Sequence, residues 1–141
     1  MKISPNAIRE NFGDDYAFLP GLDYCCGDNW LFMGDIAEGS SRMEMLLAAI
    51  SGFKPDAVIL WCPTCQCRFD KNIAPAMDIS FDALSFPQYL AKNMNRLALS
   101  DASAGTVTLH EPCKSAYTEL DLNGSREVLR QLPGVTLITR R

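Results

Sequence analysis

Six cysteines are the residues of this chain whose type and spacing could do chemistry. They fall into three groups, Cys25-Cys26-Gly27, Cys62-Pro63-Thr64-Cys65 with Cys67 just beyond it, and His110-Glu111-Pro112-Cys113. A Cys-x-x-Cys spacing brings two sulfurs close enough to hold one metal ion or to form a redox disulfide. Because stable disulfides are rare in the cytoplasm, paired thiols there more often serve metal binding or redox catalysis.

Two residues beside the thiols bear on that chemistry. Neighbouring side chains in extended backbone point apart, so Cys25 and Cys26 can share a ligand only if the chain turns sharply, and Gly27 permits such a turn. His110 is the only histidine. It could tune a metal centre or donate a proton, but we favour a histidine that is simply hydrogen-bonded at the end of a strand.

The elements that must position these groups alternate along the chain. Apolar, β-branched or aromatic runs predict short, mostly buried strands at residues 16–19, 57–61, 81–84, 107–109 and 135–139. Helical patterns fall between them, at residues 41–53, where Ser41 and Glu44 have the capping-box spacing, at 65–73, from Pro87 onward, and at 125–132. This alternation predicts an α/β fold, with a mostly parallel sheet of four to five strands flanked by helices.

Each cysteine group follows a predicted strand. The carboxyl ends of parallel strands lie along one edge of a sheet, which is the usual place for a site in such folds. We therefore expect the three groups, although far apart in the sequence, to converge at that edge.

Length and composition limit the other possibilities. A chain of 141 residues, 48% apolar and 21% charged, predicts one soluble domain over residues 1–141. The charge of −4 is interspersed and no basic stripe is present, so nucleic acid is not an expected partner. No apolar run approaches the roughly 18 residues of a membrane span, and no signal-peptide pattern opens the sequence, so we expect a cytoplasmic protein.

The cysteine motifs together resemble a known family. Cys25-Cys26-Gly27, followed after a long interval by an apolar strand that leads into Cys62-Pro63-Thr64-Cys65, is similar to the cysteine-rich CCG domain. That domain occurs in the B subunit of heterodisulfide reductase and in iron–sulfur subunits of glycerol-3-phosphate, glycolate and lactate oxidoreductases. His110-Glu111-Pro112-Cys113 resembles the His-x-Pro-Cys motif that carries the first cysteine of each repeat in the family.

This resemblance implies a ligand set and a function. One family repeat can bind a [4Fe–4S] cluster through five cysteines, and in heterodisulfide reductase the cluster is noncubane; cysteine thiolates are the usual ligands of such clusters. Carried over residue by residue, the ligands are Cys25, Cys26, Cys62 and Cys65, with Cys113 in the leading position, while Cys67 matches none and is a bystander. The implied function is an iron–sulfur subunit of an oxidoreductase, which transfers electrons or reduces a disulfide at its cluster.

The sequence also bears on where the electrons would come from. The sequence contains no Gly-x-Gly-x-x-Gly nicotinamide fingerprint. Electrons would therefore come from a partner subunit that carries flavin or further iron–sulfur clusters.

The chain departs from the family pattern in the order of its motifs. In the family the leading cysteine precedes the Cys-Cys pair, whereas here Cys25 lies too near the start and the leading motif follows at Cys113. A similarity between residues 7–13 and 128–134 also suggests that the chain holds the back half of one repeat and then the front half of the next. It is either a piece of a longer two-repeat protein, a permuted domain in which Cys113 folds back, or a homodimer that shares cysteines.

Other uses of the thiols remain open. Cys25, Cys26, Cys62 and Cys65 have the donor set of a structural tetrathiolate zinc site. Cys62 and Cys65 could instead act directly as a cluster-free dithiol. The adjacent Cys25 and Cys26 could also be buried as small apolar side chains.

Overall fold

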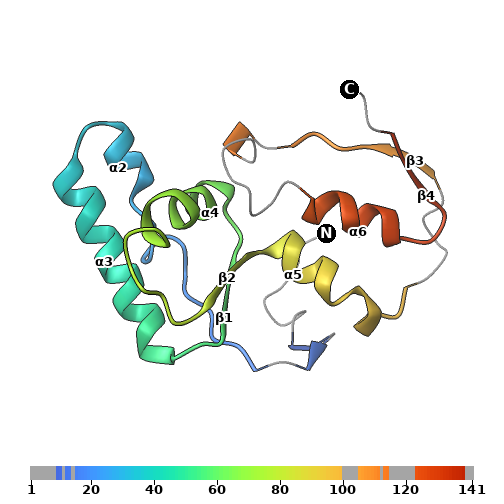
Figure 1. The fold of residues 1–141 in the computed structure, drawn as a ribbon, viewed down its shortest axis with the longest axis horizontal. Helices are drawn as coiled ribbons and strands as arrows, with labels where there is room; N and C mark the ends of the chain where they lie inside the picture. The colour runs from blue at the N-terminus through green and yellow to red at the C-terminus, as the bar shows by residue number, and fades with distance from the viewer. Residues whose placement is uncertain are drawn as a thin grey trace.

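The computed structural model describes residues 9–10, 12–13, 15–99, 105–111, 113–114 and 123–138. Figure 1 shows two groups of elements side by side. The first group contains α2 (Asp28–Phe32), α3 (Ile36–Phe53), β1 (Ala57–Leu60), α4 (Pro63–Arg68), the π-helical turn Phe69–Ile73 and β2 (Asp82–Ser85). The second contains α5 (Phe86–Lys92), the 3₁₀ turn Met94–Arg96, β3 (Gly105–Thr108), α6 (Gly124–Gln131) and β4 (Val135–Ile138).

The strands pair in parallel within each group. β1 lies beside β2, with Ala57 opposite Asp82. β3 lies beside β4, with Gly105 opposite Val135. Since parallel strands need a crossover connection, a helix lies between the strands of each pair, α4 in the first and α6 in the second. The prediction of a mixed fold with parallel strands is confirmed, whereas the strands among the described residues form two separate pairs in place of one sheet of four to five strands.

The strand predicted at residues 16–19 is absent from the structure. Residues 15–20 have no regular structure and lead into a turn, in which the Tyr24 backbone N–H donates to the Pro20 carbonyl at 3.0 Å. Pro20 and Gly21 follow the short apolar run and favour a turn over continued strand pairing. The first cysteine group is therefore reached through a loop, and the expectation that every group follows a strand is wrong for Cys25.

Helix α3 begins before its predicted start. Asp35 caps it, since its carboxylate accepts the Glu38 backbone N–H at 3.1 Å, and Ser41 and Glu44 lie inside the helix instead of at its end. Gly34, with φ of 88°, separates α3 from α2. The predicted capping box was wrong because the earlier carboxylate cap extends the helix by more than a turn. A capping box does occur at α5, between Ser85 and Gln88.

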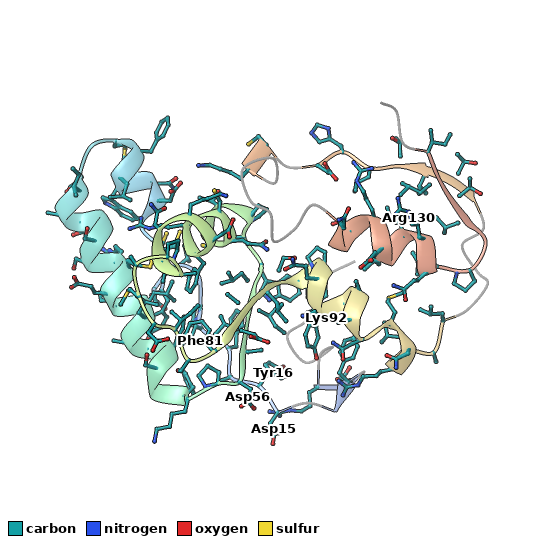
Figure 2. All side chains as sticks on the ribbon, in the orientation of Figure 1. Asp15, Tyr16, Asp56, Phe81, Lys92 and Arg130 are labelled. Atoms are coloured by element: carbon teal, nitrogen blue, oxygen red, sulfur yellow. The ribbon has the colours of Figure 1, made fainter. Side chains whose placement is uncertain are left out.

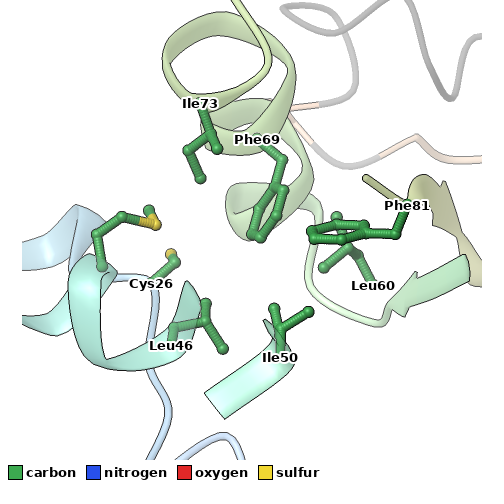
Figure 3. Packing of buried hydrophobic residues seen from close by; sticks show 8 residues of the cluster. Cys26, Leu46, Ile50, Leu60, Phe69, Ile73 and Phe81 are labelled. Atoms are coloured by element: carbon green, nitrogen blue, oxygen red, sulfur yellow. The ribbon is translucent and has the colours of Figure 1, made fainter. Parts of the chain in front are cut away.

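The core lies between α3, α4 and the first strand pair. Figure 3 shows Phe69, which is fully buried, among Leu46, Ile50, Leu60 and Phe81. Cys26 belongs to the same apolar cluster. The first cysteine group is thus fixed against the core on one side. None of the helices within the described ranges is long and apolar enough to cross a membrane.

The turn after Cys26 lies close to the backbone of α3. Gly27 has φ of 75°, and a Cβ added there would lie 2.5 Å from the Gly39 carbonyl oxygen. A Cβ on Gly39 would in turn lie 2.6 Å from Cδ2 of Leu31. Glycine at both positions lets the turn and α2 lie directly on α3.

Gly27→Ala should lower the free energy of unfolding by about 2–4 kcal/mol, because it adds an overpacked contact to a strained left-handed conformation. Gly34→Ala is the matched control, since Gly34 also has positive φ but nothing lies within 4 Å of its added Cβ. It should cost about 1 kcal/mol. Urea unfolding measures both, and equal losses in the two variants would contradict the close approach.

Candidate functional site

The Cys-Cys-Gly turn sends its two thiols to different environments. Gly27 caps α2 in a left-handed conformation. Cys26 is buried, with 2% of its surface exposed, and its sulfur accepts a hydrogen bond from the Asp28 backbone N–H. Cys25 is half-buried. The turn allowed by Gly27 therefore fixes Cys26 in the protein interior and leaves Cys25 nearer to the surface.

The second group lies at the start of α4. Cys62 is the extended residue that precedes the helix, and Pro63 occupies the first turn, where its fixed φ and missing N–H are tolerated. Cys62 is exposed and Cys65 is half-buried. Strand β1 and helix α4 thus place one thiol at the surface and the next against the core.

Cys65 connects the two groups. Its thiol makes side-chain hydrogen bonds with both Cys26 and Cys62. The structure therefore brings Cys26, Cys62 and Cys65 together. Within the described ranges, however, no set of three or more Cys, His, Asp or Glu side chains is already arranged to hold a metal ion.

The contact between Cys26 and Cys65 changes the acidity of both thiols. The hydrogen bond from Cys65 lowers the pKa of Cys26 to about 6, and the Asp28 N–H and the positive charge of Arg68 act in the same direction, against the effect of burial. The pKa of Cys65 is raised because Cys26 holds its proton and because the thiol is largely shielded from water. The pair therefore shares one proton and carries one negative charge at neutral pH.

Two ion pairs position the third group. Lys114, next to Cys113, lies 3.4 Å from the carboxylate of Asp28, at the start of α2. Arg126 of α6 lies 2.9 Å from Glu111. Both pairs are partly exposed, so each contributes little energy, but together they hold the motif between α6 and the Cys-Cys-Gly turn. Figure 1 shows this segment as the short orange turn beyond α4.

Two side chains of this third group face solvent. Cys113 and His110 are both exposed. Cys113 is brought near the first cysteine group but is not inside it. The hydrogen-bonded role expected for His110 stays a prediction.

Arg68 is a residue of the site that the sequence analysis missed. It lies three residues after Cys65 on α4 and is buried, with 6% exposed. Its Nη2 donates to the Gly39 carbonyl at 3.1 Å, while Nε and Nη1 have no hydrogen-bond partner in the described part of the chain. The i, i+3 spacing from Cys65 was visible in the sequence, but burial of the guanidinium depends on the packing of α3.

The thiols and Arg68 fit a thiolate-bound metal or iron–sulfur centre. Cysteine sulfur is a ligand type suited to zinc and to iron–sulfur clusters. A buried guanidinium with unpaired N–H groups favours a negatively charged neighbour, and its charge already acts on Cys26. The donor type and the local charge therefore agree.

The comparison with protein families supports the same interpretation. Residues 5–70 match the family model of the CCG cysteine-rich domain. This segment is therefore similar to the CCG cysteine-rich domain. The matched segment contains Cys25, Cys26, Cys62 and Cys65 and ends before Cys113. Neither the curated proteins nor the solved structures include a significant match to this chain.

A shallow pocket elsewhere is not part of the CCG site. It is lined by Asp56, Ile79, Ser80, Phe81 and Asp82, at the amino ends of β1 and β2. Figure 2 labels Asp56 and Phe81 there. The CCG cysteine Cys62 follows the carboxyl end of β1, so the two features lie at opposite ends of the strand.

In the metal-free, reduced chain, one thiolate should form with a midpoint near pH 6. Cys65→Ala should move this midpoint toward the ordinary thiol pKa of about 8.5, because the strongest donor to Cys26 is lost. Ultraviolet thiolate absorbance across a pH titration measures the change. Cys67→Ala, on the same helix, is the control and should keep the low midpoint. A wild-type chain without a thiolate below pH 8 would contradict this account.

Proposed function

We propose that this chain is an iron–sulfur subunit of an oxidoreductase, with a [4Fe–4S] cluster held by Cys25, Cys26, Cys62 and Cys65. The observation that carries the proposal is the hydrogen bond between Cys65 and Cys26, which joins the Cys-Cys-Gly and Cys-x-x-Cys motifs at one place. When bound, the cluster would supply electron transfer or, in the manner of heterodisulfide reductase, reduction of a disulfide.

The protein side chains would set the properties of such a centre. Cys26 lies against the apolar core, which keeps water from that side. Cys62 is exposed, so the opposite side stays open to an electron donor or to a disulfide substrate. The site is therefore closed toward the core and accessible at the surface, an arrangement suited to exchange of electrons with another molecule.

Cys113 is the proposed fifth ligand. The Lys114–Asp28 ion pair supports the arrangement in which Cys113 folds back within one chain, because it brings the leading motif beside the first cysteine group without a second copy. Residues 1–141 would then act as a single domain with a permuted order of motifs.

An exposed apolar surface supports the need for a partner. Phe32, Met33 and Ile36 are 88%, 73% and 69% exposed, and they lie between α2 and α3, a few residues after the Cys-Cys-Gly turn. Adjacent exposed apolar side chains are typical of surfaces that bind other proteins. We propose a redox partner subunit with flavin or further clusters, in the cytoplasm.

A cluster-free dithiol is the second candidate, and the same hydrogen bond favours it. Cys26 and Cys65 would form a disulfide and give up two electrons and the one proton that they share. A disulfide of the partner would take up both electrons and that proton, which converts it to one thiol and one thiolate. The structure favours this pair over Cys62 and Cys65, since Cys26 is the strongest partner of Cys65.

Anaerobic reconstitution with iron and sulfide should give about four iron and four sulfide per chain, with broad brown absorption. Cys62→Ser should lose most of the cluster, because it removes a ligand. Cys67→Ser is the matched control and should keep it. Iron, zinc and acid-labile sulfide analysis, with the visible spectrum, measures the result.

The alternatives give different results in the same experiment. Zinc without sulfide would indicate a structural zinc site. A metal-free chain that loses two hydrogen atoms between Cys26 and Cys65 on mild oxidation would indicate the dithiol. Loss of cluster in Cys113→Ser would support the fifth ligand, and unchanged iron content would contradict it.

A further inference from the structure

Arg68 has more hydrogen-bond donors than its protein neighbours use. Its guanidinium is buried at the end of α4, where Nη2 donates to the Gly39 carbonyl. Nε and Nη1 are both shielded from solvent, and neither meets an acceptor among the residues that the structure describes. Buried donors are nearly always paired in native proteins, so two unpaired donors on one cation point to an acceptor that is a separate group.

The nearby carboxylates do not supply that acceptor. Asp28 lies beside Lys114, and Glu38 lies beside Arg42. The positive charge of Arg68 also acts on the thiol of Cys26 and lowers its pKa. A sulfur atom therefore lies within the electrostatic reach of this arginine.

We propose that Arg68 donates Nε–H and Nη1–H hydrogen bonds to sulfur atoms of the centre bound at Cys26 and Cys65. It would offset their negative charge and raise the reduction potential of the centre. This inference rests on the proposed function, because it requires an anionic sulfur centre. Hydrogen bonds to sulfur and local charge are established determinants of cluster potential.

An arginine suits this role better than a lysine. The guanidinium can keep its bond to the Gly39 carbonyl through one nitrogen while two other nitrogens each have an N–H group left for another acceptor. A lysine ammonium is a single point of charge and cannot serve two separated acceptors as well. A purely structural brace to Gly39 would need only one of these donors, and that difference can be tested.

The test compares Arg68→Met and Arg68→Lys with wild type, using Co²⁺ as the metal probe and the reconstituted cluster for potentiometry. Arg68→Met should bind Co²⁺ about 10- to 100-fold more weakly, as read from thiolate-to-cobalt charge-transfer absorption. Its cluster should also have a more negative midpoint potential. Arg68→Lys should show smaller changes in Co²⁺ affinity and midpoint potential, in the same directions. The positive charge is kept in this variant, while the additional N–H donors of the guanidinium are lost.

Arg42→Met is the matched control. Arg42 lies on α3, pairs with Glu38 and stacks over Trp30, so its loss removes an equal charge near the same turn. It should leave Co²⁺ affinity and potential unchanged. Thermal unfolding of the metal-free variants shows whether each variant has folded. If Arg68→Met does not fold, the comparison is made with Arg68→Lys.

Wild-type values of affinity and potential in every folded Arg68 variant would overturn the inference while the proposed function stands. Equal losses in Arg42→Met and Arg68→Met would also overturn it, since the effect would then be one of overall charge. A wild-type chain that binds neither cobalt nor iron would overturn both the inference about Arg68 and the proposed function. That outcome is seen in the wild-type chain alone, before any variant is compared.

Discussion

The hydrogen bond between Cys65 and Cys26 is the contact on which the site depends. It links two motifs that are far apart in the sequence and lie on different elements, and the turn that carries Cys26 lies directly on α3. Gly27 and Gly39 allow that approach, and the core around Phe69 holds α4 against the same surface. A side chain at either glycine would separate the motifs, since packed interiors have no spare volume to absorb it.

This contact also concentrates charge in a place where charge is costly. A buried thiolate needs compensation, and the structure provides it from the Asp28 backbone N–H, the Cys65 thiol and the Arg68 guanidinium. Two nitrogens of Arg68, Nε and Nη1, stay unpaired within the described part of the chain. The site therefore has more hydrogen-bond donors than a single thiolate uses. A centre with several sulfur ligands would bring more negative charge, and this is why a metal–sulfur centre explains the site better than two isolated thiols do.

The sequence indicated the resemblance to the CCG domain more clearly than it predicted the fold. The cysteine motifs were enough to show that resemblance, because ligand chemistry needs fixed residue types at short intervals. The sheet arrangement was predicted less well, since four-residue strands such as β1 and β3 carry a weak pattern, and residues 16–19 resemble a strand until Pro20 intervenes. The start of α3 depended on a choice between two possible caps, Asp35 and Ser41. Burial of Arg68 could not be predicted, because it arises from helix packing and not from local pattern.

The central claim is that the thiols at the Cys26–Cys65 contact hold a metal–sulfur centre. Iron K-edge X-ray absorption of the anaerobically reconstituted wild-type chain tests it most directly, because it reports the atoms bound to the metal. The account predicts iron surrounded by sulfur, with a second iron nearby as in a cluster. Iron bound only to oxygen or nitrogen, or a chain that retains no iron, would contradict it.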